Sequence, residues 1–120
     1  MNDRARPPDD ITPQEFFTRW VPAAVAGDAQ RRARLGDSQA RIRFELIGME
    51  GGDYTVVLEQ GQVRGLVGPS EQADLHVRLD VATWRDLNRG VLSAPEALLR
   101  RRVKLHGDLL LAIKLHFILG

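Results

Sequence analysis

The last fourteen residues of the chain, Gly107 to Gly120, form an apolar run that has almost no polar face when it is placed on a helix. At about 100° per residue, two opposite sides of this helix are both apolar. The residues on these two sides are Leu109, Ile113 and Phe117 on one, and Leu111, Leu115 and Ile118 on the other. A helix that is apolar all round is normally buried. A domain of 120 residues has little interior for it, so we expect this helix to close a core or to border a lipid or a partner chain.

The apolar run is too short to be predicted as a membrane span. Crossing the hydrocarbon layer takes about 20 predominantly apolar residues, and Lys114 lies near the middle of this run. The first ten residues contain two arginines, three aspartates and two prolines, which is unlike a secretory signal peptide. We therefore expect a cytoplasmic, soluble protein with at most transient contact to a membrane surface.

The composition is that of one ordinary globular domain. Hydrophobic residues make up 43% of the chain, charged residues make up 28%, and the net charge is +1. A nucleic-acid-binding domain is usually strongly basic, so we expect no nucleic-acid partner. The chain contains no cysteine, which excludes disulfides, thiolate zinc sites and cysteine nucleophiles.

A charged, proline-rich leader over residues 1–11 precedes the predicted domain, which spans residues 12–120. We expect the leader to be mobile. The order Thr12 to Glu15 is typical of a helix start, because it offers a capping threonine, a proline at the first helical position and a capping-box glutamate. Pro22 is expected to kink this helix. The arginine-rich segment from Gly27 to Ser38 is predicted to be an exposed connection, with room for a helical turn.

Alternating apolar residues then predict four strands. Their apolar positions are Ile42, Phe44 and Leu46; Tyr54, Val56 and Leu58; the run Val63 to Val67; and Leu75, Val77 and Leu79. Short connections that contain glycine separate these strands. We therefore expect an antiparallel meander with one face in water.

Two short helices, a fifth strand and the apolar helix complete the predicted order. Asp80 and Ser93 are placed to cap the two short helices. Val103 and Leu105 alternate with basic residues in the fifth strand, which is predicted over residues 101–106. The order predicts an α+β fold, in which a five-stranded, mainly antiparallel sheet is covered on one face by helices.

The second half of this order resembles the sterol carrier protein type-2 domain family. The sharpest part of the resemblance is Arg102-Val103-Lys104-Leu105-His106-Gly107-Asp108, followed by the apolar run Leu109 to Leu115. This segment reads as basic-apolar alternation, then glycine and aspartate, then an apolar helix that ends near Lys-Leu. The resemblance covers roughly Ala40 to Leu115. It implies an apolar cavity between the sheet and the helices for a fatty-acyl chain, a sterol or a similar lipid, and it implies no catalytic residues.

The function expected from this resemblance is the binding, and beyond that the transfer, of a fatty acid, acyl chain, sterol-like or isoprenoid molecule. Burial of apolar surface is worth about 25 cal/mol per Å², so a long acyl chain needs no charged anchor. We expect no catalytic residue, no metal and no cofactor. The residues expected to line the pocket come from the sheet, the middle helices and the last helix: Phe44, Leu58, Trp84, Leu99, Ile113 and Phe117.

The polar residues do not form a catalytic pattern. The three histidines, His76, His106 and His116, lack the His-x-x-x-His spacing of many metal sites. No serine lies in a Gly-x-Ser-x-Gly elbow. We therefore predict that the protein is not an enzyme.

A basic stretch, Arg100 to Lys104, has two interpretations. It would suit anionic lipid headgroups, where each basic residue near a membrane surface is worth about 1 kcal/mol. Strand alternation also places Arg102 and Lys104 on the face in water, and solvation explains them without a partner. The second interpretation is the more common case.

A protein-interaction module is the competing prediction. In it the apolar helix packs against a second copy of the chain, as a homodimer, or against an enzyme subunit, and the pocket is collapsed. Some bacterial relatives in the resembled family are accessory proteins of isoprenoid-quinone biosynthesis, which favours such a role. A dimer that falls apart on Phe117→Asp would support this prediction, whereas a monomer with a bound lipid would support the first.

Overall fold

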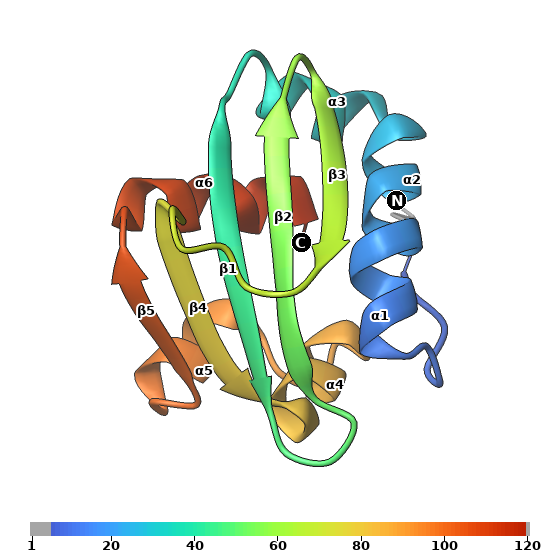
Figure 1. The fold of residues 1–120 in the computed structure, drawn as a ribbon. Helices are drawn as coiled ribbons and strands as arrows, with labels where there is room; N and C mark the ends of the chain where they lie inside the picture. Colours follow the sequence, from blue (N-terminus) through green and yellow to red (C-terminus); the bar gives the residue numbers. More distant parts are fainter. Residues whose placement is uncertain (1–5, 120) are drawn as a thin grey trace.

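The computed structural model describes residues 6–119, and Figure 1 shows one twisted sheet with helices behind it and at one edge. The strands are β1 (Ala40–Ile47), β2 (Gly52–Glu59), β3 (Gln62–Val67), β4 (Leu75–Asp80) and β5 (Val103–Gly107). They lie side by side in the order β3-β2-β1-β4-β5. The predicted α+β fold with a mainly antiparallel sheet is confirmed.

The position of β4 differs from the predicted meander. The strands β1, β2 and β3 pair antiparallel as expected, but β4 pairs in parallel with β1. The connection between β3 and β4 crosses the open face of the sheet to reach the far side of β1 (Figure 1). A hydrogen bond holds each end of this connection to the sheet. Thr55 Oγ1 donates to the Gly68 carbonyl at 2.8 Å, and the Asp74 N–H donates to the Arg41 carbonyl at 2.8 Å. The four-strand meander was therefore wrong at its last strand.

Strand alternation gives the sheet one apolar face. In register, Ile42 lies opposite Val56 and Leu75, and all three side chains are buried. The apolar face of β5 carries Val103 and Leu105, which are only half-buried. The core is therefore well covered over the central strands and more open at the β5 edge.

The N-terminal helical segment packs beside β3. It consists of α1 (Pro13–Glu15), the π-helical turn η1 (Phe16–Trp20) and α2 (Val21–Ala26). Thr12 caps it as predicted, because its Oγ1 accepts the N–H of Glu15 at 3.1 Å. Pro22 has no N–H to donate, and the expected irregularity takes the form of the π turn just before it, where the Val21 N–H reaches the Phe16 carbonyl.

Gly65 allows this segment to approach the sheet closely. A Cβ atom placed on Gly65 would lie 1.7 Å from the carbonyl oxygen of Phe17, far inside any van der Waals contact. The backbone of η1 therefore lies directly on β3, and the side chain of Phe17 reaches the interior.

The segment predicted as an exposed connection with room for a helical turn contains a longer helix, α3 (Ala29–Leu35), and the prediction that the segment is exposed was wrong at Arg31 and Leu35. Asp28 caps α3, since its Oδ1 accepts the N–H groups of Gln30 at 2.9 Å and Arg31 at 3.2 Å. Leu35 and Arg31 are both buried, and α3 packs against α6. The Arg31 guanidinium lies 5.5 Å from the Trp20 ring centroid, so this long side chain packs along an apolar surface despite its charge.

The last residues of the predicted leader contact α4 (Val81–Asn88). Arg85 Nη1 donates to the carbonyl of Ile11 at 2.6 Å and to that of Asp9 at 3.1 Å, and Ile11 is buried. The expected mobility of residues 1–5 lies outside the described part of the chain.

Both middle helices begin at their predicted caps. Asp80 Oδ1 accepts the N–H of Thr83 at 2.8 Å at the start of α4. Ser93 Oγ accepts the N–H of Glu96 at 3.2 Å at the start of α5 (Ala94–Leu99). The fifth strand begins at Val103, two residues later than predicted.

Arg102 does not lie on the solvated sheet face, which corrects the expectation from strand alternation. It precedes β5, and it points to α4, where its Nε donates to Thr83 Oγ1 at 3.0 Å and its Nη2 contacts Asp86 Oδ2 at 3.1 Å. Alternation did not apply because the residue lies outside the strand. Lys104, within β5, is exposed as expected.

We expect Asp80→Ala to lower the free energy of unfolding by about 1 kcal/mol at neutral pH, because it removes the α4 cap. Hydrogen bonds from the Thr83 hydroxyl and N–H hold the pKa of Asp80 below its ordinary value of 3.8. A carboxylate with a lowered pKa stabilises the fold above its unfolded pKa, and this stability is lost as the pH falls through the folded pKa. Denaturant titrations should therefore show that the advantage of the wild type over Asp80→Ala shrinks below pH 3.8. An advantage that persists unchanged into stronger acid would contradict this account.

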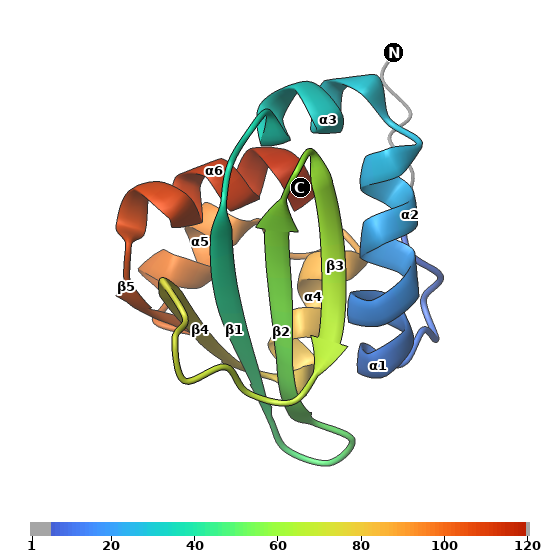
Figure 2. The same ribbon diagram turned by 45° about the horizontal axis from the view of Figure 1, so that its top comes forward.

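The apolar helix α6 (Leu109–Leu119) lies across the helical side of the sheet (Figure 2). Asp108 caps it, because its Oδ1 accepts the N–H of Leu111 at 3.1 Å. Leu111, Leu115 and Ile118 are buried, so one of the two predicted apolar sides closes the core. Within residues 6–119, no helix combines the length and the hydropathy that crossing a membrane requires.

Candidate functional site

Six aromatic side chains fill the space between the central strands and the helices. We call this set the aromatic cluster, and its members are Phe16, Phe17, Trp20, Phe44, Tyr54 and Trp84. The ring of Phe17 stacks on that of Tyr54 with centroids 4.9 Å apart and lies 4.8 Å from that of Phe44. Burial raises the pKa of the Tyr54 phenol above its ordinary value. The interior over β1 and β2 is therefore occupied by the protein's own rings.

Phe16 links this cluster to the helical layer. Its ring stacks on Trp20 at 5.5 Å and meets the edge of Trp84 at 5.4 Å. Such pairs contribute about 0.5–1.5 kcal/mol each beyond the area that they bury. The N-terminal segment thus supplies half of the aromatic packing, and it holds α4 against the sheet.

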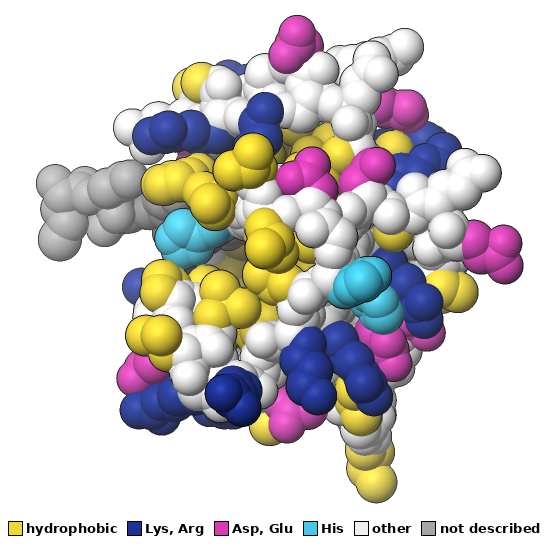
Figure 3. Space-filling view, turned by 90° about the vertical axis from the view of Figure 1, so that its left-hand side faces the viewer, with side chains coloured by type: hydrophobic (Ala, Val, Ile, Leu, Met, Phe, Trp, Pro, Cys, Tyr) yellow, Lys and Arg dark blue, Asp and Glu magenta, His cyan; other side chains and the backbone are white. Residues whose placement is uncertain are grey.

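The surface formed by α5 and α6 is apolar and exposed. Large exposed hydrophobic side chains lie on α5 and on α6: Leu98, Leu99, Leu109, Leu110, Ile113 and Phe117. The strand β5 contacts both helices, and its half-buried Val103 and Leu105 lie on the face that the helices cover. Figure 3 shows hydrophobic side chains on both sides of a hollow on this face, with further hydrophobic atoms at its floor. We call this feature, between α5 and α6 over β5, the open groove.

The open groove is the best candidate for a binding site in the described structure. Monomeric soluble proteins rarely expose a large contiguous apolar patch unless it binds something. Two polar residues contact Phe117: Arg34 of α3 lies 4.9 Å above its ring, and the His116 ring centroid lies 5.5 Å from it. An apolar chain laid in the groove would be bound by shape and burial.

The structure divides the six residues expected to line a pocket into two groups. Leu58 and Trp84 are buried, and Phe44 is half-buried against Phe17, so these three lie in the packed core around the aromatic cluster. Leu99, Ile113 and Phe117 are on the exposed helical surface, with 85%, 58% and 44% of their areas accessible. The latter three border the open groove, and their role as ligand contacts stays a prediction.

Three groove residues were absent from the predicted set, namely Leu98, Leu109 and Leu110. The apolar run at the chain end indicated the last two, because a helix formed by it is apolar on more sides than one core can bury. The sequence did not indicate which direction would be left open.

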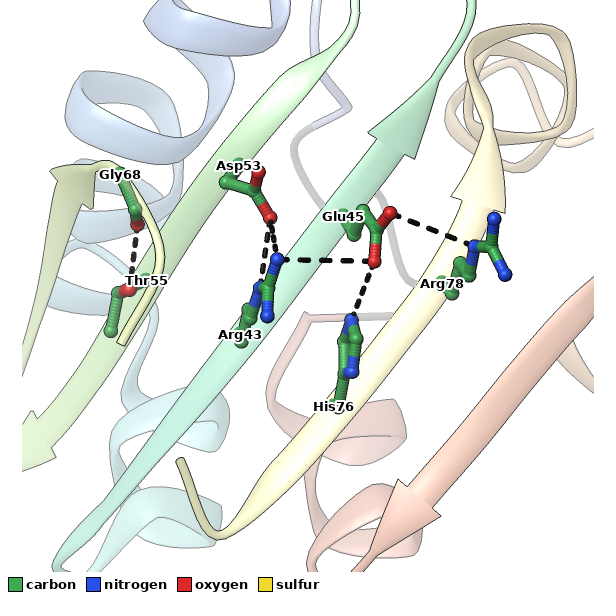
Figure 4. Close-up of polar contacts among 7 residues, drawn as sticks. All are labelled: Arg43, Glu45, Asp53, Thr55, Gly68, His76 and Arg78. Carbon is green, nitrogen blue, oxygen red and sulfur yellow. Dashed lines mark hydrogen bonds and ion pairs between the residues drawn. The ribbon is translucent and has the colours of Figure 1, made fainter. Parts of the chain in front are cut away.

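The open face of the sheet carries a network of paired charges (Figure 4). Glu45 is at its centre, since its Oε1 contacts His76 Nε2 at 2.9 Å and its Oε2 contacts Arg78 Nε at 3.7 Å. Arg43 contacts Asp53 at 2.8 Å and Glu45 at 4.0 Å. His76 is thus paired within this network on the solvated face of its strand, and its role is structural.

Among residues 6–119, no group of three or more histidine, cysteine, aspartate or glutamate side chains is arranged to hold a metal ion. The charged face and the open groove lie on opposite sides of the sheet. The charge network of the open face is therefore separate from the groove, where His116 lies with its ring centroid 5.5 Å from that of Phe117.

Comparison with known proteins gives one family match. The sequence model of the SCP-2 sterol transfer family matches residues 22–120. No curated protein matches the chain. The family match begins just after Val21, so it includes the sheet, the groove and α6, but not Phe16, Phe17 and Trp20.

Several solved structures share the fold. A double mutant of the sec-alkyl sulfatase PisA1 is similar with a TM-score of 0.72 and 24% identity, over 93% of this chain and 16% of that one. The wild-type sulfatase is from Pseudomonas sp.. The chain thus spans a small part of the sulfatase, and at this identity the likeness shows the fold alone.

Two further structures are sterol carrier proteins. Sterol carrier protein domain 2 of Helicoverpa armigera has a TM-score of 0.70 and 19% identity, with 91% of this chain and 86% of that one covered. Palmitated SCP2L2 from Aedes aegypti has a TM-score of 0.62 and 21% identity, with 86% of each chain covered. These proteins have the same layered arrangement as the chain described above.

Proposed function

Because the chain belongs to the SCP-2 sterol transfer family, we propose that it binds one lipid chain in the open groove and carries it without catalysis. The family match confirms the resemblance predicted from the segment Arg102 to Leu115. Family membership supports lipid binding or transfer in general. The nature of the lipid and its place on this chain are our proposal.

The observation that carries the proposal is the exposed apolar surface of α5 and α6. Ile113 and Phe117 lie on the side of α6 opposite to Leu111 and Leu115, which close the core. Each large apolar side chain that a lipid covers contributes about 1.5–3 kcal/mol when it is fully buried. A few such contacts are enough for micromolar binding after the cost of association is subtracted.

The aromatic cluster favours a flexible acyl chain as the ligand. Phe17 and Trp84 are buried, and with their ring neighbours they occupy the layer over β1 and β2. A rigid, wide sterol ring system would need much of this space, whereas a single acyl chain fits along one helix. The palmitated state of the Aedes aegypti protein points to the same class of ligand.

A non-catalytic role is consistent with the groove's chemistry. Its lining side chains are aliphatic or aromatic, and its polar neighbours, Arg34 and His116, contact Phe117 through ring contacts and do not form a paired catalytic group. The similarity to the alkyl sulfatase concerns 16% of that chain. We propose that this chain supplies binding, and that any chemistry on the lipid is performed by another protein.

Mass spectrometry of the purified protein tests the proposal directly. Native spectra should show a mass adduct of one lipid per chain, and organic extraction of the denatured protein should release a fatty acid. The purified protein, once stripped, should then take up a fluorescent fatty acid from solution. A protein that is empty after purification and that takes up no acyl probe would refute lipid carriage.

The interaction module remains the second candidate, because the same exposed face of α6 could be covered by protein. Phe117 and Leu110 are the residues that a second copy or an enzyme subunit would bury. Sedimentation at rising protein concentration separates the two candidates. A dimer that becomes a monomer on Phe117→Asp, together with no acyl uptake, would favour the module.

A further inference from the structure

We propose that the outer edge of β5 binds an extended segment of a partner protein in which acidic and apolar residues alternate. The segment would add a sixth strand to the sheet. β5 lies at the edge of the sheet (Figure 1), and among residues 6–119 the only strand that pairs with it is β4. This inference goes beyond the proposed function, and it does not depend on which ligand the open groove holds.

Every second residue of β5 directs its backbone groups outward from the sheet. The Asp108 N–H donates to the Asp74 carbonyl at 2.9 Å, and the register of β4 and β5 places these two residues opposite each other. Bonded and non-bonded pairs alternate along an antiparallel ladder, so the even-numbered residues of β5 bond to β4. The N–H and C=O groups of Val103 and Leu105 therefore face away from β4, where a further strand can bond to them.

The two faces beside this edge differ in chemistry. Val103 and Leu105 are half-buried on the face that borders the open groove. Lys104 and His106 are exposed on the open face of the sheet. Figure 3 looks onto the edge, with hydrophobic side chains gathered to its left and a cluster of His, Lys and Arg side chains to its right. Because successive side chains of a strand point to opposite faces, a sixth strand would match this edge with apolar and acidic residues in alternation.

The basic face has too few carboxylates for its positive charges. Lys104 lies directly opposite Arg78, and like charges in this arrangement are unfavourable. The nearest carboxylate of the network, Glu45, is shared, since it contacts Arg78 at 3.7 Å and His76 at 2.9 Å. In the part of the chain that the structure describes, no acidic side chain pairs with Lys104. An acidic residue opposite Lys104 in a sixth strand would supply the missing negative charge.

The same charges disfavour a second copy of the chain at this edge. A two-fold antiparallel pairing of two β5 strands centred on Leu105 would place each Lys104 opposite a His106, so basic residues would face each other across the new ladder. An exposed lysine on an edge strand is a common means of preventing such self-pairing. The edge therefore suits an acidic strand better than its own copy.

Fluorescence polarisation with a labelled seven-residue peptide of alternating glutamate and valine tests the proposal on the full chain. The wild type should bind this peptide at low salt and more weakly at high salt. It should not bind a peptide in which lysine replaces glutamate, nor one of the same composition with its glutamates in one block. A wild type that does not bind the alternating acidic peptide, or that binds the block peptide equally well, overturns the proposal.

Backbone methylation separates strand addition from charge attraction alone. N-methylation of the valines removes the N–H groups that bond to β5 if the peptide runs antiparallel, and N-methylation of the glutamates removes them if it runs parallel. One of the two methylated peptides should therefore bind at least about tenfold more weakly than the other, through the loss of two or more hydrogen bonds. Equal binding of the two methylated peptides would overturn the sixth strand.

A charge reversal on the protein provides the second test. Lys104→Glu should weaken binding of the acidic peptide at least about fivefold and should bind the lysine peptide instead, because the cross-strand pair is restored with its charges exchanged. Arg41→Glu is the matched control, since Arg41 is exposed on the same face but lies in β1, away from the edge. This control should keep the preference of the wild type. An equal change in both variants would show an effect of net charge alone and overturn the proposal.

Two further measurements separate this proposal from the other roles of the chain. A wild-type dimer in sedimentation that excludes the acidic peptide would assign the edge to a second copy and overturn the proposal. The Lys104→Glu variant should take up a fluorescent fatty acid as the wild type does. Uptake of the fatty acid by a wild type that binds no peptide would overturn the sixth strand and leave lipid carriage intact.

Discussion

Replacing Gly65 by alanine is expected to destabilise the fold by about 3–5 kcal/mol, the range seen when a large buried aromatic side chain is lost. The new Cβ would lie 1.7 Å from the Phe17 carbonyl oxygen, and the clashing atom belongs to the backbone, so no side-chain rotation relieves the contact. The N-terminal segment must move away from β3. That movement separates Phe17 from Tyr54 and Phe16 from Trp84, which are the central contacts of the aromatic cluster.

Tryptophan fluorescence and denaturant titration check this prediction. The chain's two tryptophans, Trp20 and Trp84, both contact Phe16, so their emission should report on the displaced segment. Gly61→Ala is the matched control. Its Cβ would meet nothing within 4 Å, and only its positive φ of 72° is unfavourable, which costs about 1 kcal/mol. A Gly65→Ala variant with wild-type stability would show that η1 does not pack on β3 in this way.

A charge placed in the open groove is expected to abolish most acyl binding. Ile113→Glu should lower the affinity for a fatty acid at least about tenfold, because it removes apolar contact area and forces an unpaired carboxylate against the ligand. The fold should survive, since Ile113 is 58% accessible and faces away from the core. Displacement of a fluorescent fatty acid measures the affinity, and circular dichroism verifies the fold.

Leu66→Glu is the control for the groove variant. Leu66, in β3, is 42% accessible and lies on the open face of the sheet, away from α5 and α6. The Leu66→Glu variant should bind the acyl probe with the same affinity as the wild type. Unchanged binding by Ile113→Glu, or an equal loss in Leu66→Glu, would place the ligand elsewhere and exclude the open groove.

The six residues predicted to line a pocket show what the periodicity of a sequence can and cannot predict. Alternation identified Phe44 and Leu58 as inward-facing, and helical spacing identified Trp84 as inward-facing. All three side chains are at least half-buried. Neither pattern distinguishes a side chain that packs against protein from one that packs against a ligand, because both need an apolar residue facing inward. Leu99 was selected by the same spacing, yet it is the most exposed leucine of α5.

Two errors have a common physical cause. The parallel pairing of β4 with β1 depends on where a connection can cross the sheet, and the burial of Arg31 and Leu35 in α3 depends on packing against other helices, among them α6. Both are set by contacts between residues far apart in sequence. Local propensity is a weak guide where such contacts decide the outcome.

The sequence by itself determined most of the local elements and the family of this protein. The caps at Thr12, Asp80 and Ser93, the alternating strands and the apolar run at the chain end are short-range patterns, in which each residue acts on neighbours a few positions away. Only the tertiary structure decided which surfaces were left uncovered. It packed the aromatic cluster over the central strands, closed the core with one side of α6 and left the other side open, because burial depends on which distant segments come together.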